Sequence, residues 1–451
     1  MRSRRQDSQR QTSNRMRSAI KVTLIVLFSV TVACVVLLMT EYAVRKIVYG
    51  QFAMPGRQTE LILDRWAAFV NNPNYSANGV RVNAQGFRRA ANLSLVKPAN
   101  TVRIFLLGGS VAYGGETLYP EIDEHWKPLD NNQTVDHYLE ARLNSVFPQK
   151  HWEVVNAAVK GYFLNQDLAL FLSTIHRYKP DYLISLDGVN DIFEMIQSPE
   201  NEDGYNSAGF GDEFMGLTNP ELMSLRLVST TWLFNHSALY RSIRESIARR
   251  RRIQARRERA NASAADLHPD LSSLGSSQHQ KYQSAVGRLE NYVRIVRQIH
   301  LLTKLEGTRA LFVLQPEIAV TGKRLTGIEM QLFDYWSRLE GPLNVYAFQN
   351  LYPQLSRQLV ADAANEGYQF LDLVNVFNGA DVQTLTDYCH LTAAGNQMVA
   401  NAIFDSLIMK FHSAIRTASN DLRGSRWPAG VIWTEGRCRP AHPPDRTRSS
   451  S

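Results

Sequence analysis

The sequence is poor in cysteine, with three among 451 residues. So small a number excludes a disulfide-stabilised scaffold, which needs a dense set of cysteines in a short chain. Cys34 lies in a long apolar stretch, whereas Cys389 and Cys438 lie far downstream and could pair in an oxidising compartment. We expect two unpaired thiols instead, with Cys389 packed beneath a loop.

Metal-ligand patterns and internal repeats are also missing. The histidines are scattered along the chain, and none of them forms a close pair with another histidine or with cysteine at the spacing of a zinc site. We therefore expect no metal and no cofactor.

Charge gives little support to a nucleic-acid partner, although the net charge is +8 and the isoelectric point is near 9.3. Residues 1–21, 241–259 and 420–451 carry +6, +7 and +3, which leaves −8 for the rest of the chain. The body is therefore acidic and has basic appendages. We expect no nucleic acid as partner.

The segment from Val22 to Thr40 contains no charged residue. In a helix it would span about 28 Å, close to the ~30 Å of bilayer hydrocarbon. We predict one membrane-spanning helix over residues 22–40. A cleavable signal peptide is the alternative, but the apolar stretch is long and no clear small-x-small cleavage site follows it.

Residues 1–21 contain seven basic side chains and one acid. The positive-inside rule keeps such a tail in the cytoplasm. We therefore expect a single-pass protein of the cell inner membrane, with the rest of the chain on the extracytoplasmic side, which is the periplasm in a Gram-negative bacterium.

Ser110 is the leading candidate for a nucleophile. It follows an apolar, strand-like run, Val102–Leu107, and the pair Gly108 and Gly109, which allows a sharp turn. A serine placed there would lie at the carboxyl edge of a sheet, where open α/β folds hold their chemistry. Taken alone, the same pattern also fits a tight turn in which Ser110 caps the next helix.

Three later segments supply possible partners. Gly161 follows one strand-like run and can offer a backbone N–H to an oxyanion, and Asn190 follows another with an amide donor. Asp387 and His390 are three residues apart, so that the carboxylate can orient the imidazole as the base for Ser110. Asp387 could also cap the following helix, while Asp187 and Asp191 are interpreted as solvated loop carboxylates.

These four segments, in this order, resemble the four blocks of the SGNH hydrolases, also called GDSL-type esterases. The resemblance implies a Ser110–His390–Asp387 triad, with Ser110, Gly161 and Asn190 forming the oxyanion hole. Gly109 stands where the short GDS form of the first block has Asp, which is similar to membrane-anchored bacterial members. The segment from Asn83 to Arg88 also resembles a lead-in of such proteins, so the likeness covers roughly residues 80–412.

Strand-like and helix-like runs alternate after residue 99, which predicts an α/β fold with a parallel sheet. Five strands fit the flavodoxin-like three-layer α/β/α sandwich that the resemblance implies. We expect a cytoplasmic tail at 1–21, the transmembrane helix at 22–40, a linker and lead-in at 41–98, the hydrolase domain at 99–412 and a flexible tail at 413–451.

The distance between Asn190 and Asp387 exceeds what this fold needs, so we expect an insertion at about 198–280 that can cover the cleft as a cap. It contains the arginine run Arg249–Arg252, charged on every face of a helix. Such a run is typical of a solvated helix or a disordered arm, and the alternative is a site for anionic lipid or acidic polysaccharide.

Together these features predict a membrane-anchored serine esterase that acts on an O-acyl ester, chiefly O-acetyl, of a cell-envelope glycan or lipid. An O-acyltransferase with the same triad remains open, because the sequence does not reveal whether water is excluded. A non-enzymatic, glycan-binding envelope protein is the other alternative, although such a protein would have no reason to retain all five site residues.

Overall fold

The computed structural model of the protein describes residues 2–49, 60–77, 79–123, 125–197, 228 and 231–421. The chain divides into two compact units, Met1–Phe404 and Asp405–Ser451. The first unit holds the whole central sheet and all candidate site residues. Cys438 and most of the expected C-terminal tail lie outside the described residues.

A five-stranded parallel sheet forms the centre of the first unit. The inner strands bury side chains on both faces of the sheet. This is why each of them is a nearly continuous apolar run in the sequence. The strands run in the order β6-β5-β7-β8-β9, with bounds β5 (Thr101–Gly108), β6 (His151–Asn156), β7 (Tyr182–Asp187), β8 (Arg309–Leu314) and β9 (Gln369–Asp372).

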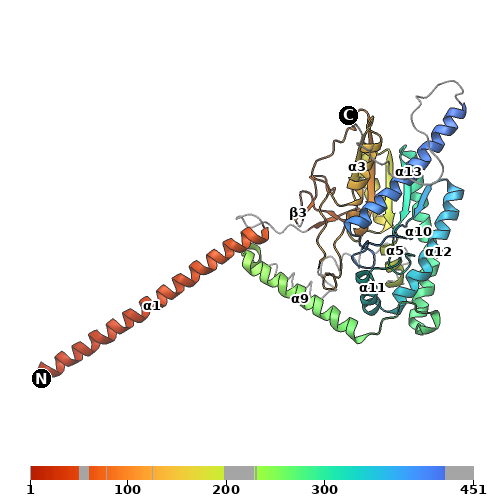
Figure 1. Cartoon of the computed structure of the whole chain (residues 1–451). Helices are drawn as coiled ribbons and strands as arrows, with labels where there is room; N and C mark the ends of the chain where they lie inside the picture. Colours follow the sequence, from red (N-terminus) through yellow and green to blue (C-terminus); the bar gives the residue numbers. More distant parts are fainter. Residues whose placement is uncertain are drawn as a thin grey trace, which may run out of the picture. The chain divides into compact units, whose positions relative to one another are not determined.

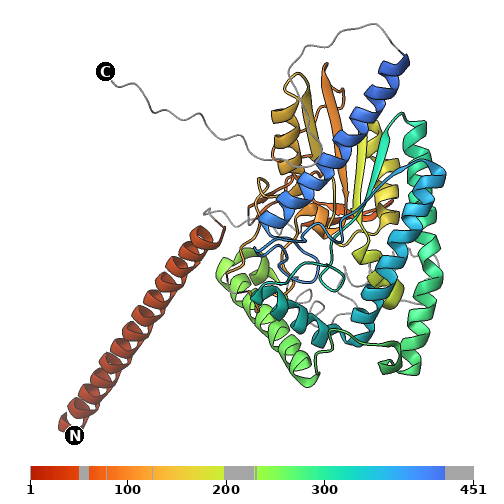
Figure 2. The same ribbon diagram turned by 45° about the vertical axis from the view of Figure 1, so that its right-hand side comes forward.

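Helices cover both faces of the sheet (Figures 1 and 2). On one side α4 (Leu164–Ser173) contacts α10 (Ser276–Leu305), which in turn contacts α12 (Pro342–Glu366). On the other side α3 (Val135–Val146) packs on β6 and meets the start of α13 (Ala393–Asp421), where the Arg142 guanidinium lies 4.1 Å from the Phe404 ring centre. This placement is what right-handed crossovers require for the observed strand order.

The α/β fold with five parallel strands is confirmed, with strand ends within two residues of those predicted. The alternation of runs in the sequence also indicated helices at 134–147, 165–178, 282–305, 349–366 and 392–412, and it did not indicate α11 (Gly327–Glu340). The helix expected over 165–178 is α4 followed by the 3₁₀ helix η1 (Ile175–Tyr178), and the last helix runs to Asp421.

The first helix, α1 (Arg2–Tyr49), includes an apolar stretch from Met16 to Val48 whose most apolar window has a mean hydropathy of 2.9 and is not buried. Among the described residues it is the one helix long and apolar enough to cross a membrane. Such a helix is consistent with a signal anchor or with a signal peptide.

Residues 60–98 form two small antiparallel pairs, β1 (Leu61–Asp64) with β2 (Ala68–Asn71) and β3 (Ser76–Ala77) with β4 (Val80–Arg81). Phe87 follows them and is buried with its ring centre 5.4 Å from that of Phe105 on β5. This part of the chain therefore packs on the sheet.

The insertion expected at 198–280 is described from residue 231 onward, together with residue 228. It contains α8 (Trp232–His236), α9 (Ala238–Ala262), the short 3₁₀ helix η2 (Leu271–Ser273) and the beginning of α10. Helix α9 carries the arginine run and lies beside α11 in both views (Figures 1 and 2). Residues 198–227 lie outside the described part of the chain.

Candidate active site

Ser110 lies at the carboxyl edge of the sheet, where β5 gives way to the short helix α2 (Ser110–Tyr113). The turn depends on Gly108, which has φ +133° and where a Cβ would come within 2.3 Å of the Leu186 carbonyl oxygen. The N-cap of α2 is Gly109, so Ser110 is the first residue of the helix and not its cap. Its N–H is therefore one of those that have no acceptor within the helix.

His390 meets Ser110 although 280 positions separate them in sequence. The Nε2 atom of His390 is 2.7 Å from Ser110 Oγ, and Nδ1 is 2.7 Å from Asp387 Oδ2. In the neutral tautomer with its proton on Nδ1, the imidazole donates to the carboxylate and can accept the serine proton on Nε2. The three side chains thus form one continuous hydrogen-bonded chain.

The Asp387 carboxylate is fully buried and accepts several hydrogen bonds. Its Oδ1 takes the backbone N–H groups of Cys389 and His390, at 2.9 and 2.8 Å, and its Oδ2 takes that of Leu118 at 2.7 Å. Burial alone would raise the pKa of Asp387, but the charge of His390 and these hydrogen bonds outweigh it and lower the pKa. The carboxylate is therefore held ionised. It does not cap α13, since Thr392 Oγ1 accepts the N–H of Gly395 there.

A buried ion pair anchors the loop that carries Asp387 and His390. Lys323 Nζ lies 2.6 Å from both carboxylate oxygens of Glu329, and both side chains are completely buried. Glu329 Oε1 in turn accepts the N–H groups of Thr384 and Leu385, at 2.9 and 3.2 Å. The position of the loop that carries Asp387 and His390 is therefore tied to a buried charge pair.

The expected oxyanion donors lie around Ser110. Asn190 Nδ2 donates to the Tyr162 carbonyl at 2.8 Å, which fixes the amide beside Gly109 and leaves its second N–H available. A Cβ on Gly109 would come within 2.5 Å of that nitrogen. Gly161 has φ +80° and lines the same pocket as Ser110, Asn190 and His390. The structure thus brings all five predicted site residues together.

The interpretation of Asp187 and Asp191 as solvated loop carboxylates is wrong. Both are buried, and they lie with Asp167 beneath the turn that carries Ser110. Asp167 Oδ1 accepts the N–H of Gly108 at 3.2 Å, and Asp191 Oδ1 accepts that of Leu164 at 3.1 Å. Burial, together with the charge of Asp187, raises the pKa of Asp191 to about 8 and that of Asp167 well above its ordinary value. Asp187 is the last residue of the buried strand β7, and Asp191 lies in the first turn of the following helix, α5 (Val189–Gln197), on its buried side, so neither carboxyl reaches water.

Cys389 is buried and unpaired, as expected. With Asp387 and His390 it forms a group whose possible metal-ligand atoms lie within 4.8 Å of one another. The chemistry of this group does not fit a metal: burial raises the pKa of the Cys389 thiol well above its ordinary value, and both His390 nitrogens are engaged by Ser110 and Asp387. Cys389 therefore fills space beneath the loop.

Sequence reasoning missed the structural role of Arg88. The guanidinium is buried and donates to the carbonyls of Tyr113 and Gly114 at 2.7 Å each, and to that of Leu129 at 2.8 Å. It thereby satisfies the carbonyls at the end of α2, the helix that Ser110 begins. Arg88 belongs to the lead-in segment that drew attention in the sequence, but no local signal showed which carbonyls it would reach.

The site opens into a pocket of about 990 Å³. Ser110, Gly161, Asn190 and His390 line it on one side, and one side of helix α9 lines it on another. We name this side of the helix the α9 face; it consists of Glu245, Ala248, Arg249, Arg252, Ile253 and Arg256. The arginine run is therefore helical and exposed, as expected of a solvated helix, and two of its arginines, Arg249 and Arg252, also line the pocket.

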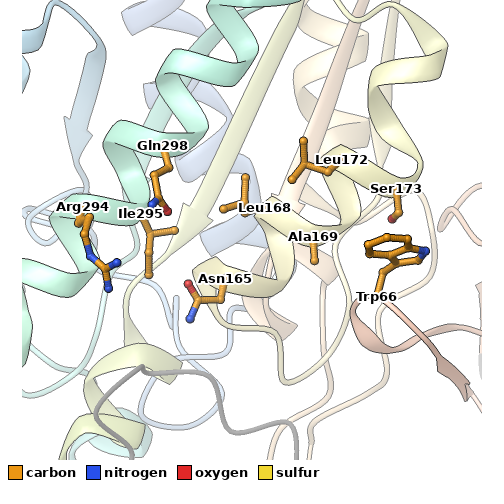
Figure 3. Close-up of a pocket in the computed structure, with 9 residues that line it drawn as sticks. All are labelled: Trp66, Asn165, Leu168, Ala169, Leu172, Ser173, Arg294, Ile295 and Gln298. Carbon is orange, nitrogen blue, oxygen red and sulfur yellow. The ribbon is translucent and has the colours of Figure 1, made fainter.

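A second pocket, of about 560 Å³, lies between α4 and α10 (Figure 3). Trp66 and Leu172 border it at one end and Arg294 at the other. None of the five predicted site residues lines it, so it is separate from the pocket that holds Ser110.

Comparison with known proteins gives structural matches alone. No protein-family model matches the chain. No curated protein matches it either. Among solved structures, the acetylxylan esterase Axe2 from Geobacillus stearothermophilus matches over 68% of this chain and 93% of its own, with 13% identity and a TM-score of 0.36. LAE5, an α/β hydrolase enzyme from the metagenome of Lake Arreo in Spain, matches over 68% of this chain and 94% of its own, with 14% identity and a TM-score of 0.32.

Proposed function

We propose that the chain is a membrane-anchored serine esterase of the SGNH type that removes an O-acyl group, chiefly O-acetyl, from a cell-envelope glycan or lipid. The observation that carries the proposal is the continuous contact from Asp387 through His390 to Ser110, with 2.7 Å at each step. The matched structures are too distant to add to this argument.

In the acylation step, Ser110 Oγ attacks the ester carbonyl carbon and His390 Nε2 takes the serine proton. The carbonyl oxygen becomes an oxyanion, which the N–H groups of Ser110 and Gly161 and the amide of Asn190 stabilise. The carbon–oxygen bond to the alcohol then breaks, the alcohol leaves with the proton from His390, and the acyl group remains on Ser110.

In the deacylation step, water attacks the acyl-serine carbonyl while His390 Nε2 takes a proton from it. The second tetrahedral intermediate uses the same donors, and its collapse releases the carboxylic acid and returns the proton to Ser110. The ionised Asp387 stabilises the imidazolium in both steps, because its pKa is lowered in this environment.

The pocket favours hydrolysis over transfer to a second alcohol. Arg249 and Arg252 line it and are both exposed, so the pocket is open to solvent. As far as the described residues define the pocket, water can therefore enter it past these two side chains. Helix α1 and its basic N-terminal side support attachment to the inner membrane with the catalytic body in the periplasm.

Labelling of the full chain by a fluorophosphonate probe, together with hydrolysis of 4-nitrophenyl acetate, tests this proposal. Wild type should be labelled and active, and Ser110→Ala should lose both properties. The Cys389→Ala variant is the matched control, since its thiol lies beside the triad but takes no part in the reaction. An unlabelled wild type, or a Ser110→Ala variant with full activity, would refute the esterase and support a binding protein.

A further inference from the structure

We propose that the α9 face recognises an anionic group on the substrate, and that the substrate is an acyl ester of an acidic saccharide. This inference deepens the proposed function and rests on it. In sequence, the arginine run fits both a solvated helix and an anion site. The structure places part of the run inside the pocket that holds Ser110.

Helical spacing explains which arginines face the pocket. Arg249, Arg252 and Arg256 lie three and four residues apart, which brings them onto one side of a helix. Arg250 and Arg251 belong to the same run but are exposed and do not line the pocket. The run is therefore divided into arginines of the α9 face and arginines that point elsewhere.

Helix α9 is held at both ends, so that its face has a defined position. At its N-terminus, Glu41 accepts the N–H groups of Ala238 and Leu239, at 2.7 and 2.9 Å. Towards its C-terminus, the Arg256 guanidinium donates to the Leu118 carbonyl at 2.6 Å. Leu118 also donates its N–H to Asp387, so one residue connects α9 to the triad.

Two arginines of the face are available for a ligand. Arg256 is engaged by Leu118, whereas Arg249 and Arg252 make no hydrogen bond or ion pair with any residue that the structure describes. A guanidinium binds carboxylate or phosphate through two parallel hydrogen bonds, which are stronger than those between neutral groups. Two such groups one helical turn apart can bind one anion together.

The pocket also contains carboxylates, so its charge is not the same throughout. Asp123 accepts from Gln383 at 3.0 Å, and Glu121 accepts from the Tyr335 hydroxyl at 3.0 Å. Glu116 lies near Tyr75, and burial, the charge of Glu60 and the charge of Glu116 together raise the pKa of that phenol to about 12. An anionic substrate is therefore repelled near Glu116 and attracted at Arg249 and Arg252, with Glu245 as the one acid of the α9 face.

The lining favours a saccharide over a lipid. Polar and charged side chains interrupt its apolar surface, while a fatty acyl chain needs a continuous apolar channel. Trp126 offers one aromatic surface among these polar groups, a combination that suits a sugar ring. We therefore assign the anion to the saccharide itself, as a uronic acid or a similar acidic residue.

Inhibition of 4-nitrophenyl acetate hydrolysis tests the proposal with the full chain in detergent. Trigalacturonate should inhibit wild type at least ten-fold more strongly than neutral xylotriose. Its inhibition constant should rise about ten-fold or more in Arg249→Gln/Arg252→Gln. Arg249→Lys/Arg252→Lys retains the charge and should lie between the two.

The matched control is Arg250→Gln/Arg251→Gln, which removes the same charge from the same run. Its inhibition constant should stay within about two-fold of wild type at 0.15 M salt, where distant charges are screened. Recognition by the α9 face would be overturned if the inhibition constant rose equally in Arg249→Gln/Arg252→Gln and Arg250→Gln/Arg251→Gln. It would also be overturned if the inhibition constant rose in neither. Inhibition by phosphatidylglycerol vesicles but not by trigalacturonate would overturn the saccharide assignment in favour of a lipid.

Failure of the proposed function gives a different result. If wild type neither hydrolyses 4-nitrophenyl acetate nor reacts with the fluorophosphonate, the esterase is refuted. Calorimetric titration of trigalacturonate into the same three double variants then tests the α9 face without any catalytic readout. Equal affinity in all variants would refute the inference as well.

Discussion

The two sides of the pocket are built in opposite ways. The floor, by which we mean Ser110, Asn190, Asp387, His390 and the buried groups that hold them, is made from helix starts and a loop at the carboxyl edge of the sheet. Its triad atoms contact one another, and its carboxylates are buried. The α9 face is a single helix wall with exposed guanidinium groups. In the function that we propose, the chemistry is fixed by the sheet edge, whereas substrate choice depends on an inserted helix.

Of the substitutions considered, Asp387→Asn should lower activity most. If activity did not fall, the contrast between a floor that performs the chemistry and an α9 face that does not would be wrong. An amide favours the wrong imidazole tautomer, so kcat for 4-nitrophenyl acetate should fall by about 10⁴-fold with the fold intact. Steady-state kinetics and circular dichroism check this. A fall of similar size in Arg249→Gln/Arg252→Gln would show that the α9 face takes part in the chemistry.

Lys323→Met should destabilise the floor without touching the pocket. It leaves the buried Glu329 carboxylate unpaired, and losing one partner of a buried pair costs about 3–5 kcal/mol in unfolding free energy. Urea denaturation measures it. Lys179→Met, at the exposed pair with Glu306, is the control and should change stability by less than about 1 kcal/mol. Equal effects would contradict the buried pair as an anchor.

Asn190→Ala tests whether Asn190 acts as an oxyanion donor, separately from the triad. Removing one oxyanion donor should lower kcat by about 10²–10³-fold, with a smaller change in KM, because the donor acts mainly on the transition state. Asn165→Ala, on neighbouring α4 and outside the pocket of Ser110, is the comparison variant. An unchanged kcat in Asn190→Ala would remove this residue from the proposed oxyanion hole.

Asp191→Asn should change how stability depends on pH. Folding raises the pKa of Asp191 to about 8, so the folded state holds a proton that the unfolded state loses near pH 4. The stability from this group is complete below about pH 4 and is lost as pH rises towards 8, by up to about 1.4 kcal/mol per pH unit.

Urea midpoints between pH 5 and 8 should therefore fall less steeply in Asp191→Asn than in wild type. Asp167 and Asp187 face the same cluster from α4 and β7 and also have raised pKa values, so some slope remains. Parallel curves for the two proteins would show that Asp191 is ionised in the folded state across this range.

Much of the architecture could be predicted from the sequence, because each strand is an apolar run that ends at glycine or a polar residue. The α11 helix was missed although Thr326 and Glu329 form a capping box, a pattern that is visible in the sequence. The signal was present there, and Leu332, Phe333 and Trp336 give the following residues an apolar face.

The candidate site residues could be predicted from the sequence, but the buried acids beneath them and the arginines beside them could not. The four blocks identify Ser110 and His390, and sheet topology explains why they meet. Nothing local shows that Asp167 lies beside Asp187, since the strand order brings them together. The arginine run is charged on every face, so its periodicity could not show which arginines turn towards Ser110.

The lack of space beside Gly109 has a consequence for finding relatives of this chain. With the Asn190 nitrogen where a Cβ would have to lie, an aspartate at position 109 requires the Asn190 side chain to shift. The residue before Ser110 and the placement of the asparagine in helix α5 (Val189–Gln197) should therefore change together through evolution. A sequence search that requires the Gly-Asp-Ser motif would miss chains with glycine before the serine. A search for Gly-Gly-Ser together with an asparagine equivalent to Asn190 should find them.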